Sequence, residues 1–303
     1  MSEGYRQRED EMKYVLVTPA RNEESYIDGT IQSVLAQALL PERWVIVSDG
    51  STDRTDSIVE KYQLAHSFIY FLRAQRDGGT NFGSKVKAFQ AGYRELANQK
   101  YDLIGNLDAD VTFSPEYFET MVSKFQEEPG LGIAGGIICE LVDGKYSPQK
   151  ISMNSVAGAV QLFRRECLEA IGGYIPIKSG GEDAAAEILG RMHGWKVRTF
   201  PEIQVMHHRR VMTGSRNILQ TRFKQGFTQY LLGYHPLFQL ARFFFRIPDK
   251  PFLIGSLISL CGYGWGFLKR AERALPTEAV RFLHSEQLKR LHFGFMTNKT
   301  SWD

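Results

Sequence analysis

The fold is decided by Tyr101-Asp102-Leu103-Ile104-Gly105-Asn106-Leu107-Asp108-Ala109-Asp110. The apolar part of this stretch, residues 101–107, predicts a buried strand, and two carboxylates one residue apart stand where that strand ends. Carboxylates at the carboxyl end of a strand can share a hard divalent cation that also binds a diphosphate. An isolated Asp-x-Asp spacing also occurs in solvated turns, so its interpretation depends on the rest of the chain.

The first two thirds of the chain alternate short apolar runs with longer amphipathic ones. Runs rich in β-branched and aromatic residues predict strands over 14–18, 44–47, 68–72 and 101–107. Helical spacing predicts helices that begin near residues 27 and 52 and a helix over 85–98. Ser114-Pro115-Glu116 predicts a further helix start. This alternation predicts an α/β fold with a mostly parallel sheet flanked by helices.

Beyond Gly130 the pattern is less regular. A glycine-rich run, 132–136, and a polar loop, 143–150, precede a predicted strand over 155–163 and a short helix over 167–171. A helix over 182–192 and two short strands over 196–200 and 203–207 complete the first predicted domain, residues 12–210. Residues 211–303 are predicted to form a basic, aromatic and helical tail.

Three further polar segments accompany the acidic triplet. Two follow the first two predicted strands and one begins a predicted helix: Thr18-Pro19-Ala20-Arg21-Asn22-Glu23-Glu24, Ser48-Asp49-Gly50-Ser51-Thr52-Asp53 and Gly180-Gly181-Glu182-Asp183. Ligands of α/β sheets gather at the carboxyl ends of strands, where Asp49 could accept from a base N–H or a ribose hydroxyl. By itself each segment could be a turn or a capped helix start. In this order and at these distances, the four segments resemble the family 2 glycosyltransferases, which have the GT-A fold.

The resemblance implies a site for a nucleotide sugar, with UDP as the favoured nucleotide and GDP as the alternative. The expected donor contacts are Pro19, Ala20, Arg21, Glu23, Asp49, Ser51, Asp53, Arg76, Asn81, Lys85, Asp108 and Ala109. Three of them belong to the segment 76–85, which is rich in donors and leads into a helix whose N-terminus could meet a phosphate. A plain glycine loop is the alternative for that segment.

The resemblance also implies a divalent cation and a catalytic base. Mg²⁺ or Mn²⁺ is expected on Asp108 and Asp110, with His207 as a further ligand, where it would neutralise the departing nucleoside diphosphate. His207 and His208 end a predicted strand, so their side chains should point to opposite faces, and either could be a structural histidine. Asp183 is the expected base, because inverting transfer needs a base beside the acceptor hydroxyl.

The candidate acceptor contacts are Glu182, Trp195, Arg209 and Arg222. Trp195 is at least equally consistent with a core position. The segment 209–222 is expected to close over the diphosphate as a lid. The stretch that begins at Gln220 lacks the Gln-x-x-Arg-Trp signature of processive polysaccharide synthases, so a single sugar addition is implied.

Charge is distributed unevenly along the chain. Residues 203–303 hold 15 Lys and Arg against 5 Asp and Glu, although the net charge of the whole chain is only +3. Such a segment should bind anions, either phosphate or an anionic lipid surface. Residues 251–268 carry no charge and suit an interfacial membrane helix, with a core or oligomer-interface helix as the alternative. We therefore expect a lipid-linked glycan or polyprenyl phosphate as acceptor, and a peripheral or monotopic enzyme at the cytoplasmic face.

Other functional classes fit the sequence less well. The three cysteines have neither disulfide nor zinc spacing, and residues 1–15 lack the apolar core of a signal peptide, so a cytoplasmic location is expected. A sugar nucleotidyltransferase would need a glycine-rich loop with Arg and Lys after the first strand, and a dehydrogenase a Gly-x-Gly-x-x-Gly motif. Three adjacent phenylalanines, 243–245, cannot share one helical face, so nucleic acid is not an expected partner. A catalytically silent membrane scaffold is the remaining alternative, and the intact Asp110 and Asp183 argue against it.

Overall fold

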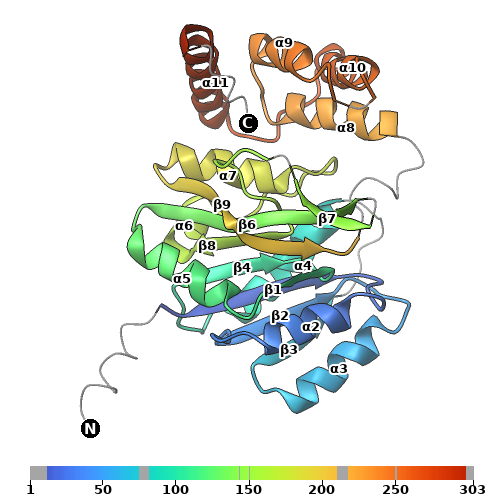
Figure 1. The fold of residues 1–303 in the computed structure, drawn as a ribbon, viewed down its shortest axis with the longest axis vertical. Helices are drawn as coiled ribbons and strands as arrows, with labels where there is room; N and C mark the ends of the chain where they lie inside the picture. The colour runs from blue at the N-terminus through green and yellow to red at the C-terminus, as the bar shows by residue number, and fades with distance from the viewer. Residues whose placement is uncertain are drawn as a thin grey trace.

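The structure is a computed structural model that describes residues 12–74, 82–142, 144–149, 151–209, 218–249 and 251–297. An α/β part is followed by a helical tail (Figure 1). The strands are β1 (Tyr14–Ala20), β2 (Arg43–Ser48), β3 (Ile69–Arg73), β4 (Leu103–Leu107), β5 (Val111–Phe113), β6 (Leu131–Val142), β7 (Lys145–Pro148), β8 (Val160–Arg164) and β9 (Lys196–His207). The helices are α2 (Ile27–Leu35), α3 (Thr55–Ala65), α4 (Phe82–Glu95), α5 (Tyr117–Glu127), α6 (Arg165–Ala170), α7 (Glu182–Met192), α8 (Ile218–Leu231), α9 (Pro236–Phe245), α10 (Ile254–Leu268) and α11 (Thr277–Thr297).

One sheet organises the α/β part. Its strand order is β3-β2-β1-β4-β8-β6-β9-β5, and β7 pairs with β6 at the side. β3, β2, β1 and β4 run parallel, as do β6 and β9, whereas the pairs β4–β8, β8–β6, β6–β7 and β5–β9 are antiparallel. The predicted α/β fold is present, but the sheet is parallel in its first half and mixed in its second. β7 and β8 follow their preceding strands without a crossover helix, and such connections permit antiparallel pairing.

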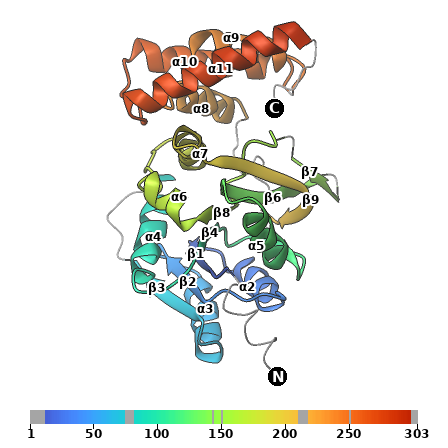
Figure 2. The same ribbon diagram turned by 90° about the vertical axis from the view of Figure 1, so that its left-hand side faces the viewer.

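The strands that lead to the polar loops are buried on both faces. Leu16 and Val17 in β1 and Ile46 and Val47 in β2 are fully buried. Helices α2, α3 and α5 cover one face, and α4, α6 and α7 cover the other (Figure 2). Burial on two faces explains why these strands read as continuous apolar runs. Gly92 lets α4 approach the sheet closely, because a Cβ there would lie 2.6 Å from Val17 Cγ1.

The second half of the sheet differs from the prediction in several places. The predicted polar loop 143–150 contains the strand β7 (Lys145–Pro148). The glycine run 132–136 lies inside the long strand β6. Its glycines are needed by packing, since a Cβ on Gly135 would lie 2.6 Å from Val160 O and a Cβ on Gly136 would lie 2.4 Å from Ile203 O. The strand predicted over 155–163 begins only at Val160, and the two strands predicted within 196–207 form the single strand β9. A register shift beside Gly136 accommodates the extra residues of β9.

The tail helices form a layer above α7 (Figures 1 and 2). Leu275, Ala279 and Leu283 from the tail complete the core cluster on the α7 side of the sheet. α10 packs on α8 through small residues, because a Cβ on Gly226 would lie 1.7 Å from Ser259 O. The opposite face of α10 is apolar and exposed. Within the described part of the chain, no helix is both long enough and apolar enough to cross a membrane.

Candidate active site

The carboxyl ends of β1, β2 and β4 border a cavity of about 510 Å³. Parallel strand ends meet at one edge of a sheet, which brings segments distant in the sequence together. The cavity is lined by Pro19, Ala20, Arg21, Glu23, Asp49, Ser84, Lys85, Ala88, Asp108, Ala109, Asp110, Lys178, Arg209 and Lys224. The wall is therefore rich in carboxylates and in cations, with α8 of the tail contributing Lys224.

Asp108 lies at the end of β4 and faces Lys85 of α4. Its Oδ1 is 2.6 Å from Lys85 Nζ, and the two side chains keep 25% and 30% of their surface exposed, so a ligand can reach both. Burial raises the pKa of Asp108, and the charge of Asp110 adds to this effect while Lys85 opposes it. Burial lowers the pKa of Lys85, but the charge of Asp108 outweighs it, so the pKa is raised overall. Lys85 is therefore a fixed cation on the cavity wall.

Asp110 is held by two groups from the end of β9. Its Oδ1 lies 3.2 Å from His207 Nε2, and its Oδ2 lies 3.4 Å from Arg209 Nε. Burial acts to raise the pKa of Asp110, but the hydrogen bond and charge of His207 and the charge of Arg209 outweigh it and lower the pKa. Conversely, Asp110 raises the pKa of His207 against the effect of burial. Asp110 is thus kept ionised, as a metal ligand must be.

Glu23 joins the same charge network from the loop after β1. Its carboxylate accepts a hydrogen bond from Arg209, and its backbone N–H donates to Thr55 Oγ1 at 2.7 Å. Burial raises the pKa of Glu23 to about 7, with the charge of Arg209 opposing this effect and the charges of Asp110 and Asp108 adding to it. Glu23 therefore binds a proton more readily than a free glutamate does.

The two adjacent histidines separate as strand geometry requires. His207 is buried beside Asp110. His208 turns away, with Nε2 2.8 Å from Thr112 Oγ1 and Nδ1 3.0 Å from Tyr146 OH. Side chains of successive strand residues point to opposite faces. Of the two histidines, His207 is therefore the one that contacts the acidic triplet.

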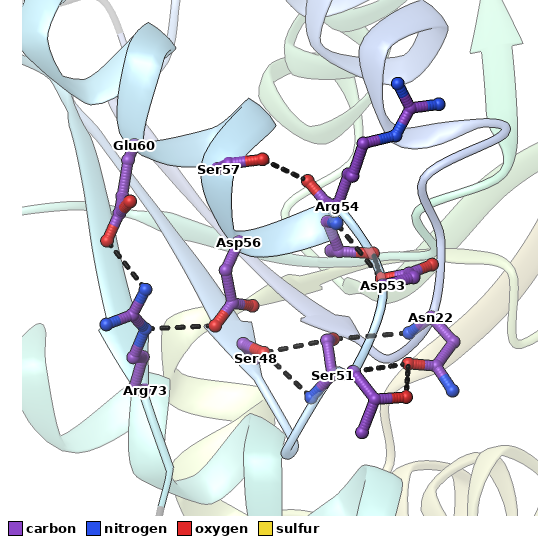
Figure 3. Close-up of polar contacts among 11 residues, drawn as sticks. Asn22, Ser48, Ser51, Asp53, Arg54, Asp56, Ser57, Glu60 and Arg73 are labelled. Carbon is purple, nitrogen blue, oxygen red and sulfur yellow. Dashed lines mark hydrogen bonds and ion pairs between the residues drawn. The ribbon is translucent and has the colours of Figure 1, made fainter.

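The loops after β1 and β2 are bound to each other (Figure 3). Asn22, at φ 53°, donates its N–H to Ser51 Oγ at 3.2 Å and accepts from Thr52 N–H at 2.8 Å. Asp53 Oδ2 accepts from the N–H of Glu24 at 3.1 Å. This junction positions Asp49 and Glu23 on the cavity wall. Ser51 and Asp53, which were predicted to contact the donor, form the junction and are not among the residues that line the cavity.

The start of α7 lies beside the acidic triplet. Glu182 and Asp183 line a small second cavity together with Asn106, Gly158 and Lys85, and Lys85 also lines the large one. Burial and the charge of Asp183 raise the pKa of Glu182. Gly158 presses against the acid pair, because a Cβ there would lie 2.9 Å from Asp183 Oδ2. Asp183 is therefore positioned both by its helix and by the loop before β8.

A model described as "Glycosyl transferase family 2" matches residues 15–182, more than half of the chain. The chain belongs to this family. It is therefore a glycosyltransferase, and the matched range begins in β1 and ends at Glu182, so it includes the acidic triplet.

Among curated relatives of this family 2 glycosyltransferase is the poly-beta-1,6-N-acetyl-D-glucosamine synthase of Staphylococcus aureus (strain COL). The two are 24% identical over 199 residues, which cover 59% of this chain and 46% of the relative. The synthase of Staphylococcus epidermidis is also 24% identical, with 44% of its length covered. The alignments thus span less than half of these relatives.

Solved structures share the fold at low sequence identity. The mannosyltransferase PcManGT from Pyrobaculum calidifontis, in complex with GDP-Man and Mn²⁺, is 17% identical with a TM-score of 0.56, and the match covers 95% of this chain and 83% of that one. S. aureus TarS 1-349 in complex with UDP-GlcNAc is 15% identical with a TM-score of 0.59, covering 96% and 93%. The GT-A fold expected from the sequence is thereby confirmed.

The acidic triplet of this family 2 enzyme fits a hard divalent cation. The described residues contain no cluster of three or more His, Cys, Asp or Glu side chains able to hold a metal. Mg²⁺ needs no such cage in nucleotide sites, where one or two carboxylates and the substrate phosphates supply the ligands. Asp108 and Asp110 provide those carboxylates on one wall. His207 contacts Asp110 through Nε2, and its Nδ1 is buried without a hydrogen-bond partner among the described residues.

Most predicted site residues meet in the large cavity, but two acceptor candidates, Trp195 and Arg222, line neither this cavity nor the small one beside it. Trp195 packs against β6, where a Cβ on Gly132 would lie 2.5 Å from Trp195 Cβ, so the tryptophan supports the fold. Arg222 lines a cavity of about 20 Å³ among α8, α9 and α10. Arg76 and Asn81 lie outside the described residues, as does most of the segment 209–222 that was predicted to form a lid.

Several residues of the site were not predicted from the sequence. Ser84, Lys178 and Lys224 line the large cavity. Lys178 and Lys224 had no recognisable motif, although Lys224 belongs to the basic stretch before residue 248.

Proposed function

We propose that this glycosyltransferase moves one sugar from a nucleotide diphosphate sugar to an acceptor hydroxyl or phosphate, with inversion at the anomeric carbon. The observation that carries the proposal is the meeting of Asp108, Asp110, Asp49 and Lys85 on one cavity at the strand ends, with Asp183 next to Lys85. UDP is the favoured nucleotide, and GDP is the alternative. One solved structure with this fold is a complex with GDP-Man and another is a complex with UDP-GlcNAc, so the fold does not choose between the two nucleotides.

The proposed chemistry assigns each charge a role. Asp183 takes the proton from the acceptor hydroxyl as its oxygen forms a bond to the anomeric carbon. The bond from that carbon to the diphosphate breaks, and its electron pair leaves with the nucleoside diphosphate. Lys85, Lys178 and Lys224 are placed to bind phosphate oxygens. A phosphate acceptor would need no base, because it attacks as an anion.

Asp108 and Asp110 are proposed to hold Mg²⁺ or Mn²⁺, which would act as a Lewis acid on the diphosphate. His207 and Arg209 hold Asp110 in its ionised form. Glu23 stands next to Arg209 and has a pKa raised by burial to about 7, so it can lose its proton when a cation enters. His207 as a direct metal ligand stays a prediction.

The acceptor is proposed to be a lipid-linked glycan or polyprenyl phosphate, reached at the cytoplasmic face of a membrane. Exposed apolar side chains on the tail support this idea. α9 exposes Leu237, Leu240 and Phe244, and α10 exposes Leu257 and Trp265, each set at helical spacing. Contiguous exposed apolar surface marks an interaction site, and basic surroundings favour an anionic lipid surface.

A thermal-shift panel of UDP-, GDP-, dTDP- and CMP-sugars tests the donor site, with and without Mn²⁺. A ligand that binds the folded state raises the melting temperature by mass action. We expect one nucleotide to produce a Mn²⁺-dependent shift that Asp110→Asn abolishes. Glu119→Gln, an exposed carboxylate in the first turn of α5, is the matched control and should keep the shift. No shift with any donor in folded protein would contradict the proposal and favour a silent scaffold.

The role of Asp183 has a separate test. Asp183→Asn should keep the donor-dependent thermal shift and lower turnover by about 10² to 10⁴, the usual contribution of a positioned base. Turnover is measured as sugar transferred to lipid-linked acceptors in vesicles and to soluble glycans. Unchanged turnover on hydroxyl acceptors would remove Asp183 from the proposed role, and transfer to soluble acceptors alone would refute the lipid-linked acceptor.

A further inference from the structure

A fourth cavity, of about 220 Å³, lies between the α/β part and the tail. Its wall is formed by the loop 151–155, by α7, by the turn before α9, and by α9 and α11. It shares none of its lining residues with the donor cavity. Its volume is several times the ~30 Å³ that one water occupies in the liquid, so a small polar group fits.

The wall of this cavity carries an excess of positive charge. Four arginines line it against two glutamates. Both glutamates contact the same arginine, since Arg191 Nε lies 3.0 Å from Glu286 Oε1 and Arg191 Nη1 lies 3.8 Å from Glu187 Oε2. Arg246 and Arg290 form no ion pair with any carboxylate in the described part of the chain. The charges of Arg246 and Arg290 are therefore not balanced by the cavity's own acids.

The cations also lie close to one another. Arg242 and Arg246 are four residues apart in sequence, at the end of α9, and both also line the small cavity that contains Arg222. Burial lowers the pKa of Arg222, and the charge of Arg246 lowers it further, although Asp249 opposes them. Like charges placed together are unfavourable unless an anion joins them. Their arrangement around an open space is typical of phosphate recognition by arginine.

We propose that this cavity binds a phosphate group, held by Arg242, Arg246 and Arg290. Ser152, Asn154 and Ser155 on the opposite wall supply neutral polar groups to the same space. The phosphate is either that of a soluble phosphorylated compound or that of an anionic lipid headgroup. The second source is compatible with α9, which turns Arg242 and Arg246 toward the cavity and exposes Leu237, Leu240 and Phe244 elsewhere on its surface.

A chain of contacts connects the cavity to Asp183 of the active site. Glu187 lines the cavity and accepts from the N–H of Val156 at 2.7 Å. Two residues after Val156, Gly158 packs against Asp183, which is one helical turn before Glu187. The phosphate site itself does not depend on the proposed function, and it can exist whichever sugar is moved.

Hydrogen–deuterium exchange on the full chain tests the proposal. Inorganic phosphate is titrated against chloride at constant ionic strength, with EDTA present so that phosphate is not drawn to a cation in the donor cavity. In a second arm, vesicles of phosphatidylglycerol are compared with vesicles of phosphatidylcholine. We expect slower exchange in residues 151–155 and in α9, and an apparent dissociation constant about tenfold higher in Arg246→Gln and in Arg290→Gln.

The variants separate the possible outcomes. Arg290 is exposed, so Arg290→Gln should fold even if Arg246→Gln does not. Arg281 is an exposed arginine of α11 outside the cavity, so Arg281→Gln should behave as wild type.

Protection by phosphate that Arg290→Gln weakens supports a soluble ligand. Protection of residues 151–155 only by phosphatidylglycerol, weakened in the same variant, supports a lipid headgroup. No protection in either arm, or protection that both variants leave unchanged, overturns the proposal. Donor binding is measured separately, as slower exchange in residues 19–24 and 108–110. A failure of the proposed donor site can therefore be told apart from a failure of the phosphate site.

Discussion

Replacing Glu187 by glutamine should remove a dependence of stability on pH that is built into α7. Glu187 is 4% exposed. Its Oε1 accepts from Val156 N–H at 2.7 Å and from Ser155 Oγ at 3.2 Å. Burial raises its pKa from 4.5 to about 8, and the charge of Asp183 adds to this, while the Val156 hydrogen bond and Arg191 oppose it. The carboxyl group is therefore protonated in the folded protein at neutral pH.

The magnitude follows from linkage between protonation and folding. The folded state binds this proton more tightly than the unfolded chain, so the free energy of unfolding falls as pH rises from about 4.5 to about 8. At about 1.4 kcal/mol per pH unit, the full interval corresponds to about 5 kcal/mol. Glutamine keeps the accepting oxygen and cannot ionise. Glu187→Gln should thus match wild type at pH 4.5 and be more stable by about 3 kcal/mol at pH 7.

Urea unfolding followed by circular dichroism at pH 5, 7 and 9 measures this difference. The gain of Glu187→Gln over wild type should grow from pH 5 to pH 7 and grow less from pH 7 to pH 9, because the difference levels off above pH 8. Glu95→Gln, an exposed carboxylate at the end of α4, is the control and should show a constant difference. A difference for Glu187→Gln that does not change with pH would refute the reasoning, because it would mean that Glu187 is ionised in the folded state throughout.

Three further substitutions test packing and positioning. Gly226→Ala should destabilise the tail by about 3 kcal/mol, seen as a lower urea midpoint, because its Cβ would overlap Ser259 O on α10. Gly158→Ala should leave the urea midpoint nearly unchanged but lower kcat by up to about 100-fold, since its Cβ displaces Asp183. Lys224→Gln should weaken donor binding about tenfold in the thermal-shift assay by removing a cation from the cavity wall, and unchanged affinity would exclude a phosphate contact.

Local patterns in the sequence were sufficient for the parallel half of the fold. The strands from Tyr14, Arg43, Ile69 and Leu103 and the helix from Glu182 lie where they were predicted, within a few residues. These elements have apolar runs of the right length and strong start or stop signals. The glycine run in β6 was not predicted as a strand, because glycine is depleted in strands and its presence here depends on contacts with Val160 and Ile203.

The sequence by itself determined the family and the identity of the acids in the site, because Asp49, Asp108, Asp110 and Asp183 stand in short segments beside recognisable elements. Only the tertiary structure decided their partners. Lys178, Lys224 and Arg209 reach the cavity from segments far along the chain, and His207 was separated from His208 by the pairing of β5 with β9. Such contacts depend on strand register and helix packing across long sequence separations, and no local pattern records them. For the same reason the sequence alone does not predict the cavity between the α/β part and the tail, where Arg191 of α7, Arg242 of α9 and Arg290 of α11 meet.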